Sequence, residues 1–138
     1  MRAASITWTV GDAENLECAD RSFAVAGSAF CLRNVTHLDR ALAEAFRALE
    51  IGGRFVCLEF SRLALPGLDK LYDAWSFKVL PALGAKIADD RAAYQYLAES
   101  IRRFPPQDQF AAMLKTAGFE RVGFTNLSGG IAALHWGW

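Results

Sequence analysis

The stretch from residue 22 to residue 32 constrains the fold of this chain more than any other. It reads Ser22-Phe-Ala-Val-Ala-Gly-Ser-Ala-Phe-Cys-Leu32, carries no charge, and is followed at once by Arg33 and Asn34. Such a run is typical of a strand buried on both faces, as in a parallel sheet. Ligands of open α/β sheets bind at the carboxyl ends of the strands, where Arg33 and Asn34 would lie. The alternative is a core strand with an ordinary polar exit.

The residues that follow predict a helix and a second strand. Thr36 and Asp39 resemble a capping box, and Gly52-Gly53 resembles a helix stop. Between them, apolar residues recur at helical spacing at Leu38, Ala41, Leu42, Ala45 and Leu49. Residues 54–60 form the next buried run. Strand, helix and strand together predict a βαβ unit with parallel strands and a right-handed crossover.

The rest of the chain predicts one more strand, three helices and a hairpin. A short β-type run over 6–10 ends at a turn. Apolar stripes predict helices over 68–80, through Tyr94, Leu97, Ala98 and Ile101, and through Phe110, Met113, Leu114 and Ala117. Gly118 ends the last helix. Residues 119–136 predict a β-hairpin around Ser128-Gly129-Gly130. We predict one α/β domain over 1–138.

Composition narrows the classes of function. The 138 residues are 53% hydrophobic, and 15 basic residues balance 15 acidic ones. Zero net charge argues against a nucleic-acid partner or an electrostatic membrane binder. No run approaches the roughly 18 apolar residues of a membrane span. Cys18, Cys31 and Cys57 form no C-x-x-C pair and are expected to be small buried thiols in a reducing compartment; with His37 and His135 each alone, no metal site is predicted.

Several blocks of sequence together resemble a known family. They are Gly11-Asp-Ala-Glu14, Phe30-Cys-Leu-Arg-Asn-Val35, Leu58-Glu-Phe-Ser61 and Tyr94-x-Tyr-Leu-Ala-Glu-Ser-Ile101. In this order and spacing the chain resembles, over essentially its whole length, the C-terminal portion of the UbiE/COQ5 family of ubiquinone/menaquinone biosynthesis C-methyltransferases. The resemblance implies a Rossmann-like class I methyltransferase fold, truncated at the N-terminus, with a C-terminal antiparallel hairpin. It also implies methyl transfer from S-adenosylmethionine to a ring carbon of a polyprenylated benzoquinol or naphthoquinol.

The resemblance implies a cofactor site. Asp12 would accept a hydrogen bond from the adenine amino group, and the backbone N–H of Ala13 would face an adenine nitrogen. Ala29 matches a position that contacts the methionine end of the cofactor and that is often serine in relatives. The alternative for Asp12 is an acidic turn residue.

The resemblance also implies a catalytic pair and a substrate channel. Arg33 and Asn34 would lie near the methyl-transfer point. Arginine is a poor base, so Arg33 is expected to polarise or orient a water or the quinol oxygen, with Asn34 fixing it. The alternative is that Arg33 pairs with a carboxylate such as Glu59 and closes the strand end. Tyr72, Trp75 and Phe77 would line a lipophilic channel, although aromatic stripes usually form core.

One family feature does not occur in this sequence. The family has a strand, a glycine-rich turn and a helix that hold the cofactor, and two strands of that part lie between its third and fourth strands. The run over 6–10 is therefore expected to lack its neighbour, and the strand over 23–32 to have an open apolar edge. We expect the isolated chain to be inactive, and to take as partner a complementing N-terminal half or a second copy. The alternative function is a non-catalytic binding or scaffold subunit. A cytoplasmic location with peripheral membrane contact is expected.

Overall fold

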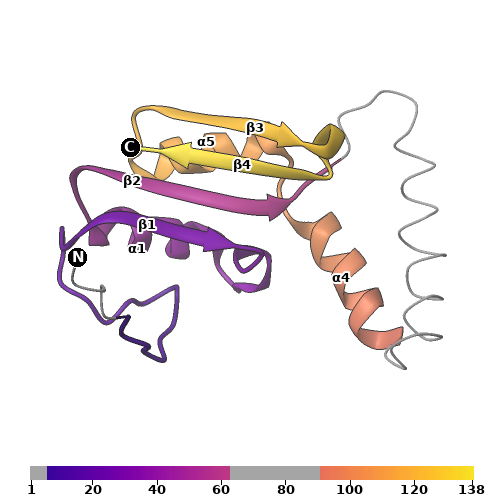
Figure 1. The fold of residues 1–138 in the computed structure, drawn as a ribbon, viewed down its shortest axis with the longest axis horizontal. Helices are drawn as coiled ribbons and strands as arrows, with labels where there is room; N and C mark the ends of the chain where they lie inside the picture. Colours follow the sequence, from indigo (N-terminus) through magenta and orange to yellow (C-terminus); the bar gives the residue numbers. More distant parts are fainter. Residues whose placement is uncertain (1–5, 63–90) are drawn as a thin grey trace.

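The computed structural model describes residues 6–62 and 91–138. Its core is a four-stranded sheet in the order β1-β2-β4-β3. The strands are β1 (Phe23–Ala29), β2 (Leu49–Phe60), β3 (Val122–Leu127) and β4 (Ala132–Gly137). β1 and β2 are parallel, while β4 is antiparallel to both β2 and β3. The predicted α/β class, βαβ unit and C-terminal hairpin are therefore confirmed (Figure 1).

Helices α1 (Leu38–Ala48) and α5 (Gln107–Ala117) pack on one face of this sheet (Figure 1). The core between them is apolar and contains Leu42, Phe55, Phe110, Leu114 and Phe119. Helix α4 (Arg91–Arg103) lies instead beyond the carboxyl ends of β1 and β2. The predicted apolar stripes thus give helices where expected, and Gly118 ends α5 with a left-handed φ of 117°.

β1 differs from the strand that the sequence predicts. The strand ends at Ala29, and Leu32–Asn34 form a short 3-10 turn, η1. It is also not buried on both faces, since Phe23 and Val25 are 49% and 61% exposed. An uncharged run is buried only where other elements cover it. In the described part of the chain, β2 pairs with one edge of β1 and no strand pairs with the other.

The β-type run over residues 6–10 does not form a strand. Its apolar side chains are exposed, Trp8 at 89% and Val10 at 97%. A strand needs the amides and carbonyls of a neighbour, and no described strand lies beside this run. The prediction of a strand here is wrong.

The start of α1 is capped from a distance rather than by Thr36. The helix begins at Leu38, and no side chain of its own N-cap residue bonds to it. Instead, Glu14 Oε1 accepts from the backbone N–H groups of Thr36 at 2.7 Å and His37 at 2.8 Å. Two amides that a capping box would satisfy locally are satisfied by a carboxylate more than 20 residues earlier.

Gly52 and Gly53 do not end α1. The helix ends at Ala48, and Leu49 begins β2 at once. The glycine pair lies inside β2, where Gly52 has a φ of 79° and the pairing with β1 changes register. A Cβ on Gly53 would lie 2.9 Å from the Glu50 carbonyl oxygen. The pair therefore serves a bulge in the strand.

One predicted element cannot be compared with the structure. The predicted helix over 68–80, with Tyr72, Trp75 and Phe77, lies outside the described residues. Cys57 is buried, but Cys31 is exposed because it stands in the turn beyond β1. Within residues 6–62 and 91–138, no helix has the length and hydropathy to cross a membrane.

Candidate functional site

Three segments meet at the carboxyl ends of β1 and β2. Ala29 is the last residue of β1, η1 follows it with Arg33 and Asn34, and α4 packs against η1. The arrowheads of β1 and β2 both point toward α4 in Figure 1. The strand end, the pair predicted to be catalytic and a helix from later in the sequence are therefore brought together at the end of the sheet where α/β proteins bind ligands.

Arg33 is held on one side of its guanidinium group. Nη1 donates to Glu59 Oε1 at 3.2 Å and Oε2 at 3.4 Å, and also to the Phe30 carbonyl oxygen. The guanidinium lies 5.5 Å from the ring centroid of Phe60. The alternative raised from the sequence, an Arg33–Glu59 pair, is thus present in the structure. The pair uses one nitrogen of Arg33.

Glu59 is a buried carboxylate near the end of β2. It is 0% exposed. Burial raises the pKa of Glu59, and the Arg33 guanidinium opposes this rise. β4 presents the small Ala133 opposite it, so Arg33 is the cation that compensates the carboxylate within the described residues.

Asn34 is anchored by a residue that sequence reasoning did not select. Its Oδ1 accepts a hydrogen bond from the hydroxyl of Tyr96 on α4, at 3.0 Å. The apolar stripe of α4 includes Tyr94 and Leu97 and leaves Tyr96 off the buried face. A large side chain with a hydroxyl, off the stripe but inside a family block, is the signal that could have pointed to Tyr96.

The loop over residues 11–15 carries the predicted adenine contacts. Asp12 Oδ1 accepts from the Glu14 backbone N–H at 2.9 Å, and its other oxygen bonds to nothing in the described residues. Ala13 is half-buried against the core. Glu14 Oε2 lies 2.8 Å from His37 Nδ1, and hydrogen bonds from the His37 backbone and side chain lower the pKa of Glu14. Glu14 thus fixes this loop over the start of α1, a role the sequence alone did not suggest.

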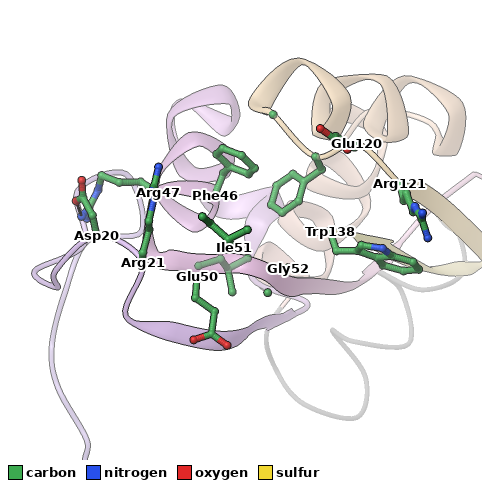
Figure 2. Close-up of a pocket in the computed structure, with 14 residues that line it drawn as sticks. Asp20, Arg21, Phe46, Arg47, Glu50, Ile51, Gly52, Glu120, Arg121 and Trp138 are labelled. Carbon is green, nitrogen blue, oxygen red and sulfur yellow. Dashed lines mark hydrogen bonds and ion pairs between the residues drawn. The ribbon is translucent and has the colours of Figure 1, made fainter.

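A hollow of about 650 Å³ lies at the opposite end of β1 and β2 (Figure 2). Its walls include Phe46 and Phe119, whose rings meet edge to face at 5.1 Å, and Trp138. Three arginines also line it, Arg21, Arg47 and Arg121. Arg47 is fully engaged by Glu44, Asp20 and backbone carbonyls. None of the site residues predicted from the sequence and described here lines this hollow.

Metal chemistry has no visible donor set in this part of the molecule. Across residues 6–62 and 91–138, no group of three or more His, Cys, Asp or Glu side chains could hold an ion. His135, on β4, is buried with Nε2 3.3 Å from the Gln107 carbonyl oxygen, and burial lowers its pKa. It is a neutral core residue.

Comparison with known proteins gives a consistent result. The model of the ubiE/COQ5 methyltransferase family matches residues 1–138. The UbiE ubiquinone/menaquinone biosynthesis C-methyltransferases of Bartonella tribocorum and Caulobacter vibrioides are 56% and 58% identical to the chain over 133 residues. Each match covers 96% of this chain but 51% and 53% of the relative. The chain therefore spans about half the length of the curated relatives it matches.

Solved structures are similar in fold. A SAM-dependent methyltransferase from Thermotoga maritima has a TM-score of 0.62 at 22% identity, covering 92% of this chain and 61% of its own. One from Aquifex aeolicus has a TM-score of 0.58 at 11% identity, covering 94% and 52%. At sequence identities of 22% and 11%, these similarities show the fold alone.

Proposed function

Because the chain belongs to the ubiE/COQ5 methyltransferase family, we propose that it forms the catalytic half of an S-adenosylmethionine-dependent C-methyltransferase acting on a polyprenylated benzoquinol or naphthoquinol. The product would enter ubiquinone or menaquinone biosynthesis. The observation that carries the proposal is the position of Arg33 and Asn34. They follow β1 directly, at the ligand-binding end of the sheet, and each is fixed by a partner from another element.

The residues present fit the adenine end of the cofactor. Asp12 keeps a free carboxylate oxygen for an amino group, and Ala13 beside it offers a backbone N–H. The fit ends there, since the sequence contains no strand, glycine-rich turn and helix in succession to hold ribose and methionine. When bound, S-adenosylmethionine supplies an electrophilic methyl group. Ala29 contributes only backbone and shape to that end of the site.

On this proposal Arg33 acts on the quinol oxygen. A hydroquinone ring carbon becomes a better nucleophile as its hydroxyl gives its proton to water, and the positive charge of Arg33 stabilises the resulting oxyanion. The ring carbon that takes the methyl group gives its own proton to water, and the phenolate oxygen is reprotonated when the product leaves. Asn34, held by Tyr96, orients the same oxygen or a water beside it. The assignment of Tyr72, Trp75 and Phe77 to a channel for the prenyl tail remains a prediction from the family resemblance, since these residues lie outside the described part of the chain. The lipid substrate brings the enzyme to the cytoplasmic surface of the membrane.

The open edge of β1 supports a complementing half as partner. Phe23 and Val25 on this strand are exposed, and the strand has an unpaired edge in the described part of the chain. A second polypeptide that adds a parallel strand here would bury them and bring the missing glycine-rich turn next to Ala29.

Calorimetry and a transfer assay test the proposal. The purified chain alone is expected to show no measurable binding of S-adenosylmethionine. Co-expressed with the N-terminal half of the Caulobacter vibrioides relative, it is expected to co-purify with that half, bind the cofactor and methylate a short-tailed demethylated quinol. Low-micromolar binding by the isolated chain would refute the requirement for a partner. A stable complex that binds cofactor but never methylates the quinol would refute the substrate.

A second candidate function is a scaffold or binding subunit without catalysis. The same exposed residues on β1 favour it, because they need a partner but not a cofactor. Size-exclusion chromatography separates this candidate from an autonomous protein, since a stable soluble monomer argues against a partner-seeking edge. Methyl transfer by the reconstituted complex argues against a purely structural role.

A further inference from the structure

Arg33 uses only part of its hydrogen-bonding capacity. A guanidinium group carries five N–H donors in a fixed plane, with Nε and Nη2 along one edge. All hydrogen bonds of Arg33 in the described residues come from Nη1, which faces Glu59 and the Phe30 carbonyl. Nε is buried and has no partner. The Nε–Nη2 edge therefore remains unused, and two parallel donors of this kind suit an anionic oxygen.

Glu59 determines which edge of the Arg33 guanidinium is left without a hydrogen-bond partner. Its two oxygens lie 3.2 and 3.4 Å from the same Nη1, so they hold one corner of the guanidinium. The Phe60 ring 5.5 Å away limits how the plane can tilt. Without the carboxylate, Nη1 would keep the Phe30 carbonyl alone, and the plane could turn about that single bond.

A purely structural account of the pair is weak on energetic grounds. Burying a carboxylate costs several kcal/mol before any attraction is counted, and apolar replacements of buried ion pairs are often neutral or stabilising. Glu59 and Arg33 are 1% and 12% exposed at their side chains. If the pair served only to cover the end of the strand, apolar residues could take its place. The pair is therefore better explained by its effect on the orientation of the Arg33 guanidinium.

We propose that Glu59 is a positioning residue, which holds Nη1 of Arg33 so that the Nε–Nη2 edge faces the quinol oxygen. This inference rests on the proposed function and extends it to a residue on a different strand. Glu59 does not touch the substrate. Its contribution passes through the orientation of Arg33.

The proposal has a consequence for pH dependence. The titratable groups near Glu59 are Arg33 and Cys31 beyond β1, Cys57 on β2 and, opposite Cys57, His135 on β4. Burial makes Cys57 and His135 neutral near pH 7, so Arg33 is the charged neighbour. Since burial raises the pKa of Glu59, the carboxylate takes up a proton above the usual range of a glutamate, and Arg33 then loses its anchor.

The test compares Glu59→Gln with Glu44→Gln in the complex with the N-terminal half. Both changes remove the glutamate charge from an Arg–Glu pair, but Glu44 pairs with Arg47 at the other end of β1 and β2. We expect E59Q to lower kcat at least tenfold with little change in cofactor affinity, and to remove the acidic limb of the kcat/KM profile. E44Q should leave both unchanged. Glu59→Asp should recover part of kcat, and it replaces E59Q if that variant does not fold. An E59Q complex with wild-type kcat and pH profile overturns the proposal.

A second measurement separates this inference from the proposed function. Side-chain ¹⁵N NMR of the isolated chain reports whether the Arg33 guanidinium rotates freely. We expect it to be fixed in the wild type and to rotate in E59Q. If the complex never transfers methyl groups, the proposed function fails, and this result alone decides the positioning role. An equally fixed Arg33 in E59Q overturns it.

Discussion

Arg33 and Arg47 stand at opposite ends of the same βαβ unit, and each pairs with a glutamate. Arg47 uses all three of its nitrogens: Nε and Nη2 bind Glu44 at 2.8 Å, Nη1 binds Asp20 and Cys18 O, and Nη2 also binds Leu16 O. Arg33 uses only Nη1. An arginine whose nitrogens all have partners ties loops together, while an arginine with an unused edge can still bind a ligand.

The difference also separates the hollow in Figure 2 from the candidate site. Three arginines, Arg21, Arg47 and Arg121, line the hollow, and the guanidinium of Arg47 has partners for all of its nitrogens. The end of the sheet beside α4 has Arg33, which uses one nitrogen in the described residues, and the amide of Asn34.

The largest expected effect is from Arg33→Lys in the reconstituted complex. Lysine keeps the charge that compensates Glu59 but lacks the planar edge of donors. We expect kcat/KM for the quinol to fall about 10²-fold, the range for loss of an oxyanion donor. The free energy of unfolding should change by less than about 1 kcal/mol. Wild-type activity in this variant would contradict a role for the Nε–Nη2 edge.

Arg47→Lys is the control for Arg33→Lys, and we expect it to lower stability rather than activity. Lysine cannot reach Glu44, Asp20 and two carbonyls together, so the loop before β1 loses contacts. We expect the midpoint of a denaturant titration to fall, because charge-assisted hydrogen bonds that tie the loop to α1 are lost. The kcat of complexes that do fold should be unchanged. A selective loss of kcat would erase the distinction between the two arginines.

Tyr96→Phe should have a smaller effect. It removes one hydroxyl and its 3.0 Å bond to Asn34 Oδ1, and such a bond contributes about 1 kcal/mol. We expect kcat to fall by roughly fivefold, as 1 kcal/mol implies, with the far-UV circular dichroism unchanged. An unchanged kcat would mean that Tyr96 packs beside Asn34 without orienting it.

The smallest effect concerns pH and stability. Hydrogen bonds from Arg47 lower the pKa of Glu44 to about 2, from an ordinary value of 4.5. Between these values the unfolded chain binds more protons than the folded chain, so Glu44 stabilises above pH 4.5 and loses this contribution as the pH falls toward 2. For Glu59 the pKa is raised, and the sign is reversed.

Unfolding curves between pH 6 and pH 3 test both signs. Glu44→Gln should make stability less dependent on pH over this range, by under about 1 kcal/mol because this pair is partly exposed. Glu59→Gln should make stability more dependent on pH. Equal slopes in the two variants would show that the two glutamates share one environment.

Local patterns in the sequence were sufficient for the order of the described elements from β1 onward, but not for residues 6–10, which form no strand. Apolar residues at helical spacing, such as Leu42 and Leu114, predicted α1 and α5, and the glycines after Ser128 predicted the turn between β3 and β4. The family blocks gave the position of Arg33 and Asn34. These features depend on residues close in sequence, where periodicity and turn chemistry act.

Features set by distant residues could not be predicted. The exposure of Phe23 depends on which strands lie beside β1, not on the residues of β1. The cap of α1 comes from Glu14, and the anchor of Asn34 comes from Tyr96, 62 positions away. The Arg33–Glu59 pair was raised as an alternative to function, and no local pattern could show that it leaves an edge of Arg33 free.

The open edge of β1 also has a consequence for the cell. Copies in which this edge is uncovered present Phe23 and Val25 to chaperones and proteases, which remove proteins with exposed apolar segments. The lifetime of each copy would then depend on how soon a further strand covers the edge of β1.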